Sequence, residues 1–181
     1  MWEEKIHLIK NTHLFTLHTY SHKLADKQSF LLTLLNIKPV SLIYSNHGED
    51  TPTERALRPD NVQEVKIFLD NLELFYCLKE DENTIEAHIS TSKVKLEEFE
   101  IAQQQKDIKK IGILLGYPET AVDAFIQNKC LPLDEQDKLL EQKGITGVTV
   151  NFRFSKNHYK EEIETYKKWY SELLKYNLLE L

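Results

Sequence analysis

The sequence predicts an α/β (or α+β) fold, with a small mixed sheet of about four strands that includes one hairpin and is covered by helices. Three observations support this fold class. Apolar residues recur at helical spacing over most of the chain, two segments alternate apolar and polar residues as half-buried strands do, and glycine and proline number five each. A length of 181 residues suits one core, so we expect a single domain over residues 1–181.

The first half of the chain predicts two helices, a strand, a helix and a hairpin. Residues 2–36 have a helical pattern in two pieces, the second capped by Asp26. Residues 40–44 indicate a buried strand, and the capping-box pattern of residues 60–63 opens a helix. Residues 74–79 and 84–90 form the predicted hairpin. The strand–helix–strand unit over 40–79 is expected to have a right-handed crossover.

The second half predicts four helices, a strand and a last long helix. One of residues 90–92 caps a helix that runs to Gln105, and Asp107 begins the next, which ends at Gly116. Pro118 starts a helix to about residue 128. Asp134 caps a short helix, residues 148–154 alternate as a fourth strand, and Asn157 caps the last helix.

Composition narrows the functional classes. The net charge is −6, from 23 basic and 29 acidic residues, which argues against nucleic-acid binding because a phosphate backbone attracts a surplus of positive charge. No apolar tract is long enough to span a bilayer, and the acidic start of the chain does not resemble a secretory signal. Two distant cysteines favour a reduced, cytoplasmic setting. Phosphate-binding glycine loops and dinucleotide fingerprints are missing, so no cofactor is expected.

The polar segment 46–60 is the first candidate site because it follows the end of a buried strand. Of three arginines in the chain, Arg55 and Arg58 lie here, and a guanidinium binds carboxylate or phosphate through two parallel hydrogen bonds. Asn46 and His47 could contribute a hydrogen bond and a titratable group. Arg153, on the polar side of its strand, could join them. An exposed, mobile loop is the alternative interpretation.

These residues support three hypotheses about function. The leading one is a non-catalytic binding or regulatory module that recognises a small anionic ligand or a protein partner through residues 46–60. The second is a small metal-independent enzyme for a phosphorylated or carboxylated substrate, with His47 as general base. The third is a helix-turn-helix DNA-binding regulator through residues 114–128, although Glu119 and Asp123 on the recognition helix carry the wrong sign for a phosphate backbone.

The motif Leu115-Gly116-Tyr117-Pro118 resembles a segment of an uncharacterised prokaryotic family. In that family the motif is often followed by paired cysteines, where this chain has Thr120 and Ala121. This departure removes any metal or thiol role that the family segment implies. The resemblance covers roughly fifteen residues and implies a small bacterial, archaeal or phage-like α/β protein. The turn itself is expected to be a packing corner between two helices.

Three further residue patterns have a structural and a functional interpretation. His18 and His22 share a helix face, but without acidic or cysteine neighbours they are expected to be exposed, and no metal is predicted. His88 and Glu86 share a strand face and could do acid–base work in a cleft, or lie on a solvated face. Tyr159, Tyr166, Tyr170 and Trp169 are at core spacing, with a partner surface as the alternative.

Overall fold

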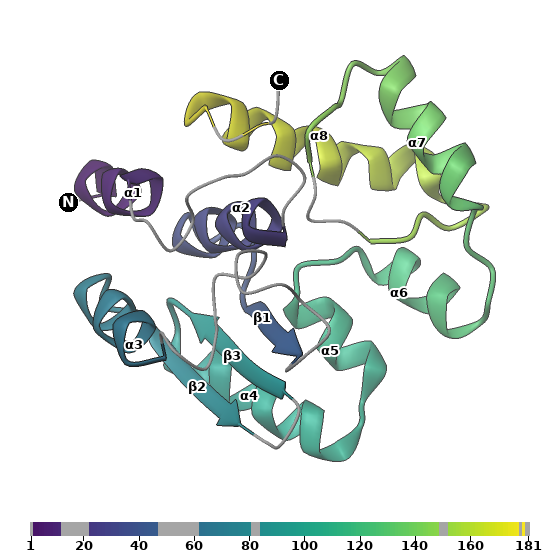
Figure 1. Ribbon diagram of the computed structural model, residues 1–181. Coiled ribbons are helices and arrows are strands. Elements are labelled where there is room, and N and C mark those ends of the chain that lie inside the picture. Colours follow the sequence, from purple (N-terminus) through teal and green to yellow (C-terminus); the bar gives the residue numbers. More distant parts are fainter. Residues whose placement is uncertain are drawn as a thin grey trace.

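The computed structural model describes residues 2–11, 22–46, 62–80, 84–148, 152–177 and 179. These residues form eight helices and one three-stranded sheet (Figure 1). In chain order the elements are α1 (Trp2–Asn11), α2 (His22–Leu34), β1 (Ser41–Asn46), α3 (Val62–Asn71), β2 (Phe75–Glu80), β3 (Thr84–Ser90), α4 (Lys93–Gln105), α5 (Ile108–Leu114), α6 (Glu119–Ile126), α7 (Leu133–Gln142) and α8 (Tyr159–Lys175).

The sheet has the strand order β1-β3-β2, and both pairs are antiparallel. The predicted hairpin is confirmed, because β2 pairs with β3 with Cys77 opposite His88. The predicted mixed sheet of about four strands is wrong, because the sheet has three strands and its pairs are antiparallel. β1 and β2 run in the same direction but lie on either side of β3, so helix α3 joins two strands that are not neighbours.

The segment predicted as a fourth strand does not join this sheet. Residues 149–151 lie outside the described residues, and residues 152–154 are not in a regular strand. Ser155 makes one isolated antiparallel bridge with Cys130, and the N–H of Leu131 donates to the carbonyl of Phe154 (2.8 Å). The alternating pattern therefore reflects the burial of Phe152 and Phe154 beside helix α8, not pairing with a sheet neighbour.

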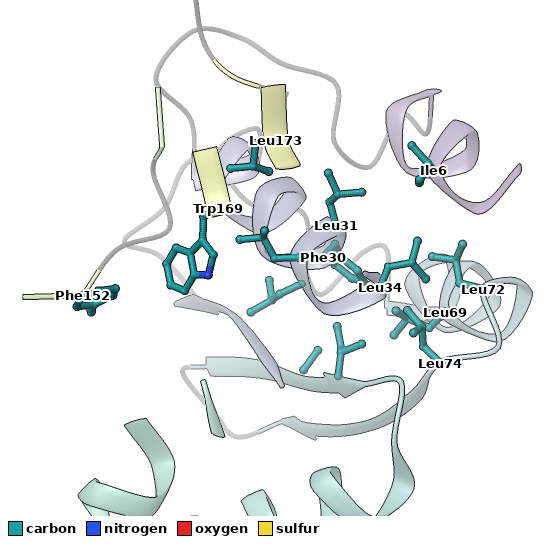
Figure 2. Packing of buried hydrophobic residues seen from close by; sticks show 14 of the residues in the cluster. Ile6, Phe30, Leu31, Leu34, Leu69, Leu72, Leu74, Phe152, Trp169 and Leu173 are labelled. Carbon is teal, nitrogen blue, oxygen red and sulfur yellow. The ribbon is translucent and has the colours of Figure 1, made fainter. Parts of the chain in front are cut away.

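Helices cover both faces of the sheet. Helix α2 packs on β1 and β3, and Figure 2 shows its residues Phe30, Leu31 and Leu34 in the core. The inward row of β3, Ile85, Ala87 and Ile89, belongs to the same core. Helix α4 covers the opposite face, where the ring of Phe99 meets that of His88 edge to face at 4.9 Å. His88 and Ser90 of the second row of β3 are therefore buried as well, while the side chain of Glu86 stays 39% exposed. The alternative of a solvated face is wrong for His88.

Helix α8 packs against α2 and contributes Tyr166, Trp169 and Leu173 to the core. The core interpretation of its aromatic residues is confirmed for Tyr166 and Trp169, which are fully buried. Tyr159 and Tyr170 are half-buried and pack against the same core. Among the described residues, no helix has the length and apolar character needed to cross a membrane.

The predicted caps are confirmed at two helices. Ser92 accepts from the N–H of Lys95, and Asp107 accepts from the N–H of Lys110 (2.9 Å). Gly116 has a positive φ of 82°, as expected where a left-handed turn follows α5. Other helices begin earlier or later than expected, since α2 starts at His22, and α7 and α8 have Pro132 and His158 at their N-caps.

Candidate functional site

The predicted anion-binding segment lies almost entirely outside the described residues. His47, Arg55 and Arg58 are not described, and Asn46 is described only through its backbone at the end of β1. Their convergence on one recess therefore stays a prediction. Arg153 is the predicted site residue whose side chain the structure describes, and it lies at a cavity.

This cavity has a volume of about 280 Å³ and lies between α5, α6 and residues 152–153. Its walls are mostly aliphatic and aromatic. They comprise Ile108, Ile111, Gly112, Leu115, Tyr117, Ala121, Val122, Phe125, Phe152 and Arg153. Gly112 allows the two helices to approach closely, because a Cβ at this position would lie 2.7 Å from a methyl group of Val122. The segment whose turn was expected to be a packing corner thus also builds a cavity.

Arg153 supplies a positive charge to this apolar wall. One terminal nitrogen, Nη2, donates to the carbonyl of Leu131 at 2.5 Å, and Nε is buried with no hydrogen-bond partner. Within the described residues, no carboxylate forms an ion pair with the guanidinium. A buried donor left unsatisfied costs about 1–3 kcal/mol, so an acceptor at Nε would be stabilising.

Two buried polar side chains hold the segment that carries Arg153. The amide of Gln136 donates to the carbonyl of Phe152 (2.9 Å) and accepts from the N–H of Phe154 (2.8 Å), as a neighbouring strand would. The carboxylate of Glu162 accepts from the N–H of Ser155 and from the hydroxyl of Thr120, both at 2.7 Å. These bonds tie residues 152–155 to α6, α7 and α8 and fix the backbone at Arg153.

Lys38 is a second cation near the cavity wall, although it does not line the cavity. It is 3% exposed, its Nζ donates to the hydroxyl of Ser29 (3.1 Å), and Nζ lies 5.8 Å from the ring centroids of both Tyr117 and Trp169. Burial lowers the pKa of Lys38 to about 7. Burial also raises the pKa of the Tyr117 phenol, so this neighbour stays uncharged.

His88 lies in a closed cluster of charges on the α4 side of the sheet. Its Nδ1 contacts Glu100, its Nε2 lies 3.2 Å from Glu86, and the second oxygen of Glu100 pairs with Lys79 at 2.7 Å. Burial alone raises the pKa of Glu100, but hydrogen bonds from Lys79 and His88 hold it below its ordinary value. The predicted pairing of His88 with Glu86 is thus present, yet His88 is 0% exposed and does not line the cavity beside Arg153.

Cys77, the cross-strand partner of His88, does not behave as an activated thiol. Burial raises its pKa, and the neighbouring carboxylate of Glu100 raises it further. A thiol held in its protonated form is a poor nucleophile. The histidine pair at 18 and 22 lies outside the residues with described side chains, and among described residues no three His, Cys, Asp or Glu side chains gather around a metal-sized site.

The charges on α6 do not favour contact with DNA. Lys109 of α5 pairs with both Glu119 (2.8 Å) and Asp123 (2.9 Å), so the basic group beside this helix is already neutralised. Near its end the helix exposes Phe125 and Ile126 rather than cations. Exposed apolar side chains and a lysine that is already paired with carboxylates release no counterions from a phosphate backbone, so they add little to DNA binding.

Sequence reasoning missed the cavity and Lys38. The signal for Lys38 was present, because a lysine between Ile37 and Pro39 interrupts an apolar run that continues into β1. The sequence gives no such signal for the cavity, since its walls come from α5, α6 and residues 152–153, which helix α7 separates from α6 along the chain. Comparisons of the chain with protein-family models, with curated proteins and with solved structures gave no match.

Proposed function

We propose that this protein is a binding module for a small anion with an apolar body, which it holds in the cavity between α5 and α6. Arg153 binds the anionic group, and the aliphatic and aromatic walls enclose the rest of the ligand. The position of Arg153 at an apolar cavity, with no carboxylate partner for its guanidinium among the described residues, carries this proposal. The leading hypothesis for residues 46–60 was a small anionic ligand or a protein partner, and Arg55 and Arg58 are open to a separate role.

The size of the cavity limits the ligand. An apolar cavity of about 150 Å³ binds benzene, so about 280 Å³ suits a ligand of about eleven non-hydrogen atoms. A medium-chain carboxylate such as octanoate, or an aryl acetate such as phenylacetate, has this size and one negative charge. A nucleotide is too large and too polar for these walls.

The charge of Arg153 gives the preference for an anion. A hydrogen bond to a charged group contributes about 1.5–3 kcal/mol, which corresponds to roughly tenfold to hundredfold in affinity. Octanamide has the same length and shape as octanoate but no charge, so the pair isolates this contribution. The apolar walls should contribute equally to both ligands.

The test is a titration of the protein with octanoate and with octanamide at pH 7, in which binding is measured by calorimetry or by changes in the NMR shifts of α5 and α6. The wild-type protein should bind octanoate about tenfold more tightly or better, and Arg153→Gln should remove that preference. Lys156→Gln is the matched control, because it removes one positive charge three residues further along the chain, at a residue that does not line the cavity. Ile111→Trp should weaken both ligands by filling the cavity, whereas Ile126→Ala, exposed on α6, should weaken neither.

Equal affinity for the two ligands, or an equal loss in Arg153→Gln and Lys156→Gln, would contradict the role of Arg153. Absence of binding for both ligands and for phenylacetate would contradict the cavity as the binding site. The hypothesis of an enzyme with His47 as base rests on residues outside the described part. It is tested separately by the pH dependence of turnover in His47→Ala.

A further inference from the structure

We infer that binding of an anion in the cavity is linked to protonation of Lys38, so that the protein binds its ligand more tightly in acid than in base. This inference rests on the proposed function and adds regulation by pH to the same site. Its geometric basis is a buried ammonium group beside the turn that forms one wall of the cavity.

The contact between Lys38 and the cavity wall is direct. The Lys38 side chain packs against Gly116, where a Cβ would lie 3.2 Å from its Cγ, and its ammonium lies over the ring of Tyr117. Tyr117 lines the cavity, and its ring lies 5.6 Å from that of Phe152, another wall residue. The turn formed by Gly116 and Tyr117 therefore lies between the ammonium group of Lys38 and the cavity.

The surroundings of the ammonium group leave its charge poorly compensated. Helix α2 offers the Ser29 hydroxyl, helix α8 the ring of Trp169, and the α5–α6 turn the ring of Tyr117, whose phenol is the titratable group facing Nζ. Among the described residues, no carboxylate lies within ion-pair distance of Nζ. Asp26 and Lys27, the other buried charged residues of α2, have partners of their own.

A ligand carboxylate supplies the missing negative charge from within the cavity. Attraction between the two groups is strong where little water screens it, so the anion favours the ammonium form. Because the pKa of Lys38 lies near 7, part of the free protein carries neutral Lys38 at neutral pH. Binding then draws a proton from solution, and the linkage is reciprocal, so protonation tightens binding.

The experiment measures octanoate binding at pH 6, 7 and 8 for the wild type, Lys38→Met and Lys156→Gln. Calorimetry at pH 7.5 in two buffers with different ionisation enthalpies counts the protons taken up. We expect wild-type affinity to fall about fivefold or more from pH 6 to pH 8, the lower end of typical couplings between sites, with net proton uptake. Lys156→Gln should behave as the wild type, and Lys38→Met should bind equally at all three pH values without uptake.

Octanamide provides the matched control for the ligand, because its uncharged head should show no pH dependence in any variant. If octanoate binds in an Arg153-dependent manner but with constant affinity and no proton uptake, the linkage is wrong and the proposed function stands. If the pH dependence persists in Lys38→Met, another group causes it and the role of Lys38 is wrong. If octanoate does not bind the wild type at all, both proposals fail.

Discussion

Replacing Lys38 by methionine should make the protein more stable at neutral pH and remove part of the pH dependence of its stability. Methionine keeps an unbranched chain of similar length but leaves no charge to bury. In the folded protein the pKa of Lys38 is about 7, against 10.5 in the unfolded chain. Between these values the unfolded chain holds a proton that the folded protein has released, so the free energy of unfolding rises with pH.

The size of the effect follows from the two pKa values. Below pH 7 both states are protonated, and the folded protein carries the full penalty of a buried charge, on the order of 5 kcal/mol. From pH 7 to pH 9 the wild type should recover about 2 kcal/mol of this penalty. Lys38→Met, without the charge, should be the more stable protein at pH 6, and its advantage should shrink by that amount as pH rises.

Urea unfolding at pH 6, 7, 8 and 9, followed by circular dichroism, measures the difference between the two proteins. A change of about 2 kcal/mol corresponds to a shift of about 1 M in the urea midpoint for a slope of about 2 kcal/mol per M. Burial raises the pKa of Cys77 and Cys130, but both thiols are present in both proteins and cancel in the difference. Parallel stability curves over the whole range would refute a buried lysine that loses its proton near neutrality.

Two further predictions concern the walls of the cavity and their supports. Gln136→Leu should lower the free energy of unfolding in urea titrations by about 2–4 kcal/mol, because it leaves two buried backbone groups unpaired beside Arg153. The same variant should bind octanoate more weakly. Gln142→Leu, exposed on the same helix, should change neither the stability nor the binding. Gly112→Ala should lower the free energy of unfolding by roughly 1–3 kcal/mol, because the added methyl group clashes with Val122. In a Val122→Ala background, which removes the clashing methyl groups, Gly112→Ala should cost much less. A double variant as unstable as the sum of the two single variants would exclude the clash.

Local patterns predicted most elements of the fold. The hairpin, the caps at Ser92 and Asp107, and the break at Gly116 each depend on residues within a few positions of one another, and the structure confirms them. The prediction of a fourth strand was wrong because the pairing of this segment depends on a residue that is distant in the sequence. The alternation of Phe152 and Phe154 with polar residues correctly predicts that one face of the segment is buried. The hydrogen bonds of their backbone, however, are made by the side chain of Gln136 on helix α7, and a strand pattern gives no indication of such a partner.

The candidate site was predicted less well than the fold. Arg153 was singled out for the chemistry of its guanidinium, and the structure places it at a cavity, but its expected neighbours in residues 46–60 lie outside the described residues. The second face of β3 shows why burial is hard to infer. Glu86, His88 and Ser90 have the polarity of a solvated row, but only Glu86 remains partly exposed. His88 and Ser90 are buried because helix α4 packs over this face and carboxylates satisfy His88.

The position of β2 in the sheet has a consequence for association between molecules. In the described part of the chain β2 pairs with β3 alone, so its other edge presents backbone donors and acceptors beside the exposed ring of Phe75. Charged edge residues protect such strands from pairing with strands of other chains. Lys79 and Glu80 are the charged residues of β2, so we expect the hairpin to become the site of aggregation in any variant that makes both residues apolar.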